Sequence, residues 1–180
     1  MLMDQEELLP GVYLITLPVS KDNRGQFTKT FHPSLFSCLP GNFSIAESYY
    51  SVSHQGVIRG MHFQVGSSAH SKLVYCSHGS ALDVIVDVRK ESPFFNAPIS
   101  VTLHAEDDKA ILVGKGYAHG FLSLADSTIM NYSTTTIYDP CKDMGVLWSS
   151  IAFDWPTHQP ILSPRDCAHP PITDTSCVFS

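Results

Sequence analysis

The chain has 180 residues, of which 43% are hydrophobic and 16% are charged, and its formal net charge at pH 7 is −6. This composition is typical of one ordinary globular domain and excludes a disordered or fibrous chain. The negative charge disfavours a nucleic-acid surface, which normally shows a basic stripe, and no apolar run approaches the length of a membrane span.

Short alternating segments bounded by turn residues recur along the chain, and strands are expected there. In chain order they are Val12–Val19, Ser44–Ser53, Val57–Gln64, Lys72–Ser77, Ala81–Arg89, Ile99–Ala105, Ala110–Val113, Phe121–Leu124 and Thr128–Tyr138. Many short strands of similar spacing predict an all-β sandwich or small barrel.

Helix is scarce in this pattern. Single turns are expected at Pro33–Cys38 and Pro93–Phe95. From Trp155 onward prolines recur, which predicts an irregular C-terminal wrap rather than a second domain. Residues 1–180 are therefore expected to form a single domain.

The cysteines and the N-terminus bear on the compartment. Five scattered cysteines without a C-x-x-C pair predict neither a zinc site nor a disulfide framework. The first nine residues are acidic and lack the basic region of a secretory signal. A cytoplasmic location is expected.

Alternation along the strands predicts which side chains share a face. In Ala81–Arg89 the even positions are apolar, while the odd positions include two carboxylates and an arginine. Met130, Tyr132 and Tyr138 share a face if their strand is regular. One face of each strand is thus expected to be core and the other partly polar.

The most informative stretch is Gly56-Val57-Ile58-Arg59-Gly60-Met61-His62-Phe63-Gln64, with Ala118-His119-Gly120-Phe121 downstream. Arg59 and His62 fall on opposite faces of a regular strand, and we expect a bulge at Gly60 to bring them together. Together they suit an anion site that moves a proton.

Taken singly, most of the polar candidates also suit structural roles. A histidine in a strand is more often a hydrogen-bonded structural residue than a catalyst, and a buried tyrosine often only packs. Asp166 lies in what reads as a simple turn. The remaining histidines of the region, His54, His70, His78 and His104, are expected in turns or at exposed positions.

Taken together, the motifs resemble a known family. They are Asp22-x-Arg24-Gly25-x-Phe27, Ser51-x-Ser53, the Gly56–Gln64 stretch, Lys72-Leu73-Val74, Asp83-Val84-Ile85-Val86-Asp87-Val88-Arg89, Ser92-Pro93, Gly116-Tyr117-Ala118-His119-Gly120-Phe121, Tyr132 with Tyr138, Trp155-Pro156 and Leu162-Ser163-x-Arg165-Asp166. In this order and at these spacings they resemble the dTDP-4-dehydrorhamnose 3,5-epimerase family over about residues 10 to 168.

The resemblance implies a cupin-type double-stranded β-helix (jelly-roll) barrel that forms a homodimer. It implies epimerisation of a nucleotide-diphospho-4-keto-6-deoxy-hexose at C3 and/or C5, in deoxysugar and surface polysaccharide (O-antigen) biosynthesis. No cofactor and no metal are expected. A metal cupin offers two histidines one residue apart, whereas this chain has His62-Phe63-Gln64.

The resemblance also implies the catalytic roles. Removing a proton beside a ketone and returning one to the opposite face requires a base, an acid and a cation for the enolate. By position, His62 matches the base, Asp166 its paired carboxylate, Tyr132 the acid and Lys72 the group beside the ketone oxygen.

The resemblance places further residues at the substrate. His119 and Tyr138 match residues of the sugar pocket, and Arg59 matches a diphosphate contact, which suits a bidentate guanidinium. The nucleotide or sugar contacts are matched by Arg24, Phe27, Asp143 and Arg165.

Departures from the family pattern fall at Lys29, Glu47 and Tyr49, all on the expected nucleotide side. They lead to the hypothesis that the reaction is kept while the nucleotide is changed to CDP or GDP. The alternatives left open are a 3-epimerase acting on such a sugar, a 3,4-ketoisomerase, and a non-catalytic sugar-nucleotide-binding cupin.

Overall fold

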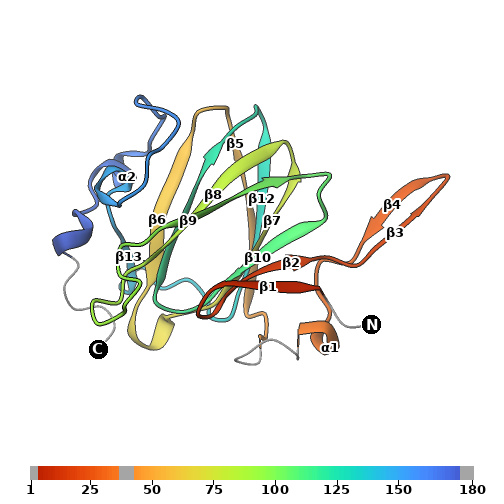
Figure 1. Ribbon diagram of the computed structural model, residues 1–180, viewed down its shortest axis with the longest axis horizontal. Helices are drawn as coiled ribbons and strands as arrows, with labels where there is room; N and C mark the ends of the chain where they lie inside the picture. The colour runs from red at the N-terminus through yellow and green to blue at the C-terminus, as the bar shows by residue number, and fades with distance from the viewer. Residues whose placement is uncertain (1–3, 37–42, 175–180) are drawn as a thin grey trace.

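The computed structural model describes residues 4–36 and 43–174. Two antiparallel sheets face each other (Figure 1). The first has the strand order β1 (Gln5–Leu9), β2 (Val12–Thr16), β10 (Lys109–Val113), β7 (Lys72–His78), β12 (Thr128–Thr134) and β5 (Glu47–Ser53). The second has the order β13 (Asp143–Gly145), β6 (Ile58–Gln64), β11 (Tyr117–Ser123), β8 (Ser80–Asp87) and β9 (Ile99–His104).

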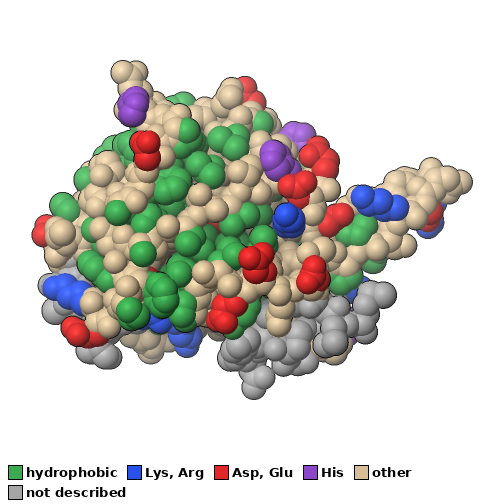
Figure 2. Space-filling view, viewed as in Figure 1, with side chains coloured by type: hydrophobic (Ala, Val, Ile, Leu, Met, Phe, Trp, Pro, Cys, Tyr) green, Lys and Arg blue, Asp and Glu red, His purple; other side chains and the backbone are tan. Residues whose placement is uncertain are grey.

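The other elements lie outside the two sheets. Strands β3 (Val19–Asp22) and β4 (Gly25–Thr28) form a hairpin that stands out from the body (Figures 1 and 2). Helical turns are short: α1 (Pro33–Phe36), α2 (Pro164–Cys167), η1 (Gly66–Ser68), η2 (Trp148–Ser150) and η3 (Ile172–Asp174). None of the helices in the described ranges is long and apolar enough to cross a membrane.

Apolar residues cover both faces of the second sheet. Between the sheets, Val74, Ile85, Phe121 and Met130 belong to one core cluster. On the outer face, the even positions of β8 pack with residues of the C-terminal segment in a second cluster that includes Trp155. This segment therefore holds a fixed position over the sheet, which matters because it carries α2.

The structure corrects several expectations about the elements. The predicted strand Val12–Val19 is broken at Pro18 and continues in the hairpin, and Phe121–Leu124 extends back to Tyr117. The sequence reading missed β1 and β13, and Pro93–Phe95 forms a turn with a bridge from Phe95 to Asp87 instead of a helical turn. The turn predicted at Pro33–Cys38 exists as α1, although its last two residues lie outside the described ranges.

The expected bulge at Gly60 is confirmed. His62 pairs with His119 while Arg59 pairs with Phe121, so three steps on β6 oppose two steps on β11. Gly60 has a φ of +137°, and a Cβ there would lie 2.5 Å from Cα of Gly120. The close approach of the two backbones thus requires glycine and turns Arg59 toward the face of His62.

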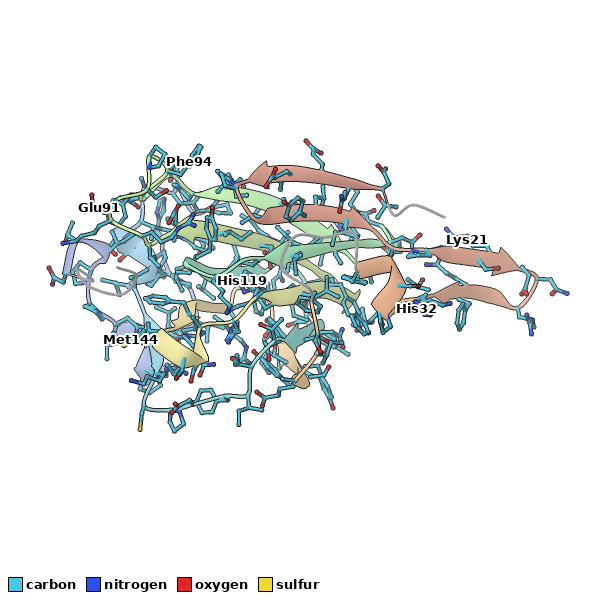
Figure 3. The ribbon with its side chains drawn as sticks, turned by 90° about the horizontal axis from the view of Figure 1, so that it is seen from below. Lys21, His32, Glu91, Phe94, His119 and Met144 are labelled. Carbon is cyan, nitrogen blue, oxygen red and sulfur yellow. The ribbon has the colours of Figure 1, made fainter. Side chains whose placement is uncertain are left out.

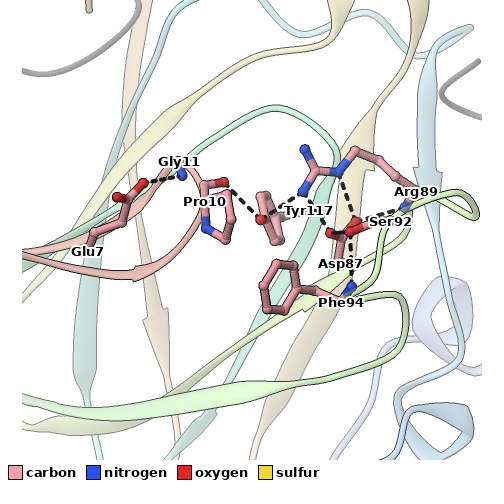
Figure 4. A network of polar contacts seen from close by, with 8 residues as sticks. All are labelled: Glu7, Pro10, Gly11, Asp87, Arg89, Ser92, Phe94 and Tyr117. Carbon is pink, nitrogen blue, oxygen red and sulfur yellow. Dashed lines mark hydrogen bonds and ion pairs between the residues drawn. The ribbon is translucent and has the colours of Figure 1, made fainter.

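A buried polar network ties β8 to the turn between β1 and β2 (Figure 4). Asp87 is fully buried and accepts hydrogen bonds from Arg89 Nη2 and Ser92 Oγ, each at 2.6 Å. Arg89 donates to the Tyr117 hydroxyl, which donates to Pro10 O at 2.9 Å. Burial raises the pKa of Asp87, but the hydrogen bonds from Arg89 and Ser92 outweigh it and leave the pKa below its usual range.

We expect Asp87→Ala to lower the free energy of unfolding by about 3 kcal/mol, because Arg89 and Ser92 lose their buried acceptor. Urea unfolding at neutral pH measures this loss, with Ser92→Ala as the milder control. Since the folded pKa is depressed, the contribution of Asp87 is present above the unfolded pKa and is lost as pH falls through the folded pKa. An Asp87→Ala protein as stable as wild type would contradict the assignment.

Candidate active site

A cavity of about 450 Å³ is lined by residues from both sheets and from α2. Eleven of the residues predicted for the site line it: Glu47, Tyr49, Arg59, His62, Lys72, His119, Tyr132, Tyr138, Asp143, Arg165 and Asp166. Residues that are far apart in the sequence therefore meet at one place in the fold.

His62 and Asp166 form the closest polar pair in this cavity. His62 Nε2 lies 2.6 Å from Asp166 Oδ1, and the carboxylate is buried while the imidazole side chain is 29% exposed. Burial raises the pKa of Asp166, but the hydrogen bond and the charge of His62 outweigh it and hold the pKa below its usual range. An ionised Asp166 accepts a hydrogen bond from Nε2–H of His62. The other ring nitrogen, Nδ1, then carries the lone pair.

Asp166 is held by the first turn of α2. Ser163 caps this turn, and its Oγ accepts a hydrogen bond from the backbone N–H of Asp166 at 3.1 Å. Ser163-Pro164-Arg165-Asp166 has the S-x-x-[DE] pattern of a capping box with proline at the first helical position, and the simple turn read from the sequence is thereby corrected. This signal could have located the helix.

Lys72 is a buried cation on the opposite sheet. Burial lowers the pKa of Lys72 to about 8, against the opposing effect of the Asp83 and Asp143 carboxylates. Its Nζ donates to the carbonyl oxygen of His62 at 3.4 Å. The ammonium group therefore lies beside the strand that carries His62.

Tyr132 is the buried phenol of the cavity. Its ring stacks on Tyr49, with the centroids 5.0 Å apart and the planes 18° from parallel. Burial raises its pKa well above the usual value, although the Ser51 hydroxyl opposes the shift. The phenol of Tyr132 is thus protonated at neutral pH and holds its proton more tightly than a phenol in water.

A second histidine–carboxylate pair reaches the cavity through His119. His119 Nε2 is 2.8 Å from Asp83 Oδ2, and both side chains are buried; His119 is labelled among the strands in Figure 3. The sequence reading missed Asp83 as a site residue. Its signal was a carboxylate at an odd position of Ala81–Arg89, on the face that we expected to be at least partly polar.

The guanidinium of Arg59 stands at the edge of the cavity. Its Nε donates to Ser53 Oγ at 3.0 Å, and Nη2 donates to Val52 O at 3.1 Å. These bonds leave the other amino group, Nη1, for a ligand. A held guanidinium of this kind binds phosphate oxygens well.

Two polar contacts hold other residues that line the cavity. Glu47 Oε2 accepts a hydrogen bond from the backbone N–H of Tyr138 at 2.7 Å, and Arg165 forms an ion pair with Asp143. Tyr138 was expected on the same strand face as Tyr132. The strand ends at Thr134, so Tyr138 instead reaches the cavity from the following loop, because Glu47 holds its backbone there.

Three predicted residues lie away from this cavity. Arg24 and Phe27 belong to the projecting hairpin and Lys29 follows it. Arg24 pairs with Asp22 at 2.5 Å, while the Phe27 side chain is exposed. The structure does not bring these residues to the cavity of the same chain.

His70 and Gln64 also line the cavity. His70, expected in a turn or at an exposed position, accepts a hydrogen bond at Nδ1 from Gln64 Nε2 at 3.0 Å. Burial, with the charge of Lys72, lowers the pKa of His70 to about 3. Gln64 also accepts a hydrogen bond from Asp139 N, so its amide braces the loops around the cavity.

One group in the described ranges, His62, Asp166 and His169, has metal-ligand atoms within 4.8 Å of one another. Two ligand atoms of a tetrahedral zinc ion with bonds of about 2.0 Å lie roughly 3.3 Å apart. The 2.6 Å between His62 Nε2 and Asp166 Oδ1 is instead a hydrogen-bond distance. The arrangement fits a hydrogen bond between His62 and Asp166 better than the coordination of a metal ion.

Comparisons with known proteins identify the family. The family model for dTDP-4-dehydrorhamnose 3,5-epimerase matches residues 6–174. The dTDP-4-dehydrorhamnose 3,5-epimerase of Escherichia coli K12 is 41% identical over 162 residues, 88% of each chain. The dTDP-4-dehydrorhamnose 3-epimerase of Streptomyces niveus is 35% identical over 161 residues, 88% of this chain and 78% of the relative.

The fold agrees as well. The crystal structure of dTDP-4-dehydrorhamnose 3,5-epimerase from Sulfolobus tokodaii covers 100% of both chains with a TM-score of 0.93 and 32% identity. The cupin-type barrel implied by the motifs is therefore confirmed. The chain belongs to the dTDP-4-dehydrorhamnose 3,5-epimerase family of isomerases.

Proposed function

We propose that the protein epimerises a dTDP-4-keto-6-deoxy-hexose at C3 and C5 by removing and returning protons through an enolate. The observation that carries the proposal is the His62–Asp166 pair on a cavity that Lys72 and Tyr132 also line. A non-catalytic binding barrel would need the cavity and the cations, but not a base with a fixed tautomer. The family name supports a place in rhamnose synthesis, and we propose that the sugar serves surface polysaccharides.

His62 is the base in this mechanism. Because Nε2–H is donated to Asp166, the lone pair on Nδ1 takes the proton from the carbon beside the ketone. The imidazolium that results lies against an ionised, buried carboxylate, which stabilises its charge. The electron pair of the broken C–H bond moves to the ketone oxygen and forms the enolate.

Lys72 stabilises the enolate oxygen, and its low pKa makes this step sensitive to pH. We expect kcat to fall as pH rises through about 8, because the ammonium loses its proton there. Lys72→Gln should lower kcat at neutral pH by about 10²–10³-fold and remove this alkaline limb. A pH profile of both proteins measures the effect, and an unchanged limb in Lys72→Gln would assign it to another group.

Tyr132 returns the proton to the opposite face. Its phenol is protonated at neutral pH, and its place on β12 faces β6 across the cavity. Protonation by the phenol completes the inversion of one centre. After His62 has released its proton to solvent and Tyr132 has regained one from solvent, the same sequence of steps at the second carbon flanking the ketone inverts the other centre.

We propose dTDP as the nucleotide, as in the relatives' names. Two of the residues that suggested another nucleotide have other contacts: Glu47 binds the backbone of Tyr138, and Tyr49 stacks on Tyr132. Titration with dTDP, CDP and GDP tests this choice. Tightest binding of CDP or GDP would restore the hypothesis of a changed nucleotide.

We also propose a homodimer in which the hairpin of one copy completes the cavity of the other. Phe27 lies in β4 of the projecting hairpin and is 66% exposed, and the resemblance gives Arg24 and Phe27 a nucleotide contact. An exposed aromatic side chain of this kind suits stacking on a base.

Subunit mixing tests the shared site. His62→Asn and Arg24→Ala/Phe27→Ala proteins, each nearly inactive alone, should regain activity when their subunits exchange, because one cavity then has both an intact base and an intact arm. Absence of activity in verified mixed dimers would mean that the arm does not act in the partner's cavity.

The reaction itself is tested by following dTDP-4-keto-6-deoxy-glucose with the wild-type protein by NMR. A product inverted at both C3 and C5 is expected. A product inverted at C3 alone would identify a 3-epimerase, as in the Streptomyces niveus relative, and an unchanged sugar would favour the binding barrel.

A further inference from the structure

His169 lies beside the His62–Asp166 pair without lining the cavity. Its Nε2 is 3.7 Å from Asp166 Oδ1, the same oxygen that lies 2.6 Å from His62 Nε2. The two imidazoles meet edge to face, with the ring centroids 5.4 Å apart. Two histidines thus converge on one carboxylate oxygen.

The His169 ring is enclosed by the fold. Its side chain is 11% exposed, and within the described ranges its Nε2 is buried with no hydrogen-bond partner at its present distance. A buried donor without an acceptor is costly, and Asp166 is the acceptor that a small displacement would bring within reach. A hydrogen bond from His169 Nε2 to Asp166 Oδ1 therefore requires only a small displacement of the ring.

Strand β13 provides the space for this ring. A Cβ on Gly145 would overlap the His169 imidazole at Nε2 and both adjacent carbons. Gly145 is not among the glycines with positive φ, so its backbone would accept alanine, and its Cα pairs with His62 across β13 and β6. The absence of a side chain at Gly145 is what admits His169 beside the pair.

We propose that His169 is a positioning residue for the epimerisation: a small displacement of its ring lets Nε2–H donate to the Asp166 carboxylate, and Asp166 then fixes the orientation and tautomer of His62. This inference rests on the proposed role of His62 as the base. The charged groups around His169 are His62, Arg165, Asp166 and Asp143. Burial, followed by His62 and Arg165, lowers the pKa of His169, so its imidazole is neutral at neutral pH and does not compete for the proton of His62.

Two variants at position 169 test the donor. His169→Leu removes it and is expected to lower kcat by about tenfold or more, with KM unchanged, which is the scale for groups that orient functional side chains. His169→Gln keeps an N–H donor and should recover most of the loss. Equal kcat in wild type and His169→Leu would overturn the proposal.

The tautomer of His62 is a second readout, which would not change in the variant if His169 had only a structural role. In ¹⁵N NMR of the free wild-type protein, His62 should be the Nε2–H tautomer, and in His169→Leu it should be a mixture. Since no substrate is present, this result stands apart from the epimerase assay. An unaltered His62 tautomer in a folded His169→Leu protein would reject the positioning role, whatever the epimerase activity of that protein.

A substitution at Gly145 gives a second test, because it moves the His169 ring away from Asp166. Gly145→Ala should lower kcat and disturb the His62 tautomer by pushing His169 away, whereas the same change in a His169→Ala background should have little further effect. Additive losses in this cycle would mean that Gly145 acts on β6 directly and that the space for His169 is irrelevant.

Discussion

His62→Asn is expected to lower kcat by about 10²–10⁴-fold or more, because it removes the only group in the proposed mechanism that takes a proton from carbon. Asparagine keeps a polar side chain of smaller size in the cavity, but its amide reaches only to the position of Nδ1, so Asp166 loses its Nε2–H partner. The affinity for dTDP should stay near that of wild type, since the nucleotide contacts are elsewhere. Steady-state kinetics and a dTDP titration measure the two quantities.

Two outcomes would change this assignment. Appreciable epimerase activity in His62→Asn would mean that another group abstracts the proton, with His119 as the nearest candidate in the cavity. A parallel loss of dTDP binding and of thermal stability would show a structural role for His62. The thermal midpoint of unfolding is the control that separates these cases.

Tyr132→Phe is expected to uncouple proton removal from inversion. The phenylalanine ring keeps the stack on Tyr49, so only the proton donor is lost. His62 still removes the substrate proton and, after exchange with solvent, returns one to the same face. Inversion should fall by about 10²–10⁴-fold while exchange of the substrate hydrogen with deuterated water continues.

NMR of the recovered substrate distinguishes the rate of hydrogen exchange from the rate of inversion. Label without inversion is the expected result for Tyr132→Phe. If exchange and inversion fall together, Tyr132 would act before or during proton removal instead. If neither changes, the acid would be another group or bound water.

The sequence predicted the barrel strands well because each has alternating apolar residues, as in Ala81–Arg89. It did not predict the strands of the projecting hairpin, whose residues are mostly exposed and have no buried face to produce a pattern. The short strands β1 and β13 were missed for a similar reason, since register with neighbouring strands rather than local alternation defines them.

For the site, the motifs identified the residues but only the fold shows how they pair. The bulge at Gly60 was predictable from a glycine between two polar residues that had to share a face. The Asp83–His119 pair was not, because it depends on the register of β8 against β11. His169 was missed because its contact with Asp166 needs both the α2 turn and the space above Gly145.

The departures at Lys29, Glu47 and Tyr49 illustrate the limit of reading function from position alone. Each looked like a change in a nucleotide contact. In the fold, Glu47 and Tyr49 are engaged with Tyr138 and Tyr132, contacts that join residues about 80 to 90 positions apart. No local pattern encodes such contacts.

The most direct test of the proposed reaction is the incubation of wild-type protein with dTDP-4-keto-6-deoxy-glucose in deuterated water, followed by NMR or mass spectrometry of the recovered sugar. Deuterium at both C3 and C5 is the predicted result, since each inversion replaces a carbon-bound hydrogen with one from solvent. A recovered sugar without deuterium at either carbon, from a protein that binds the compound, would contradict proton transfer by His62 and Tyr132.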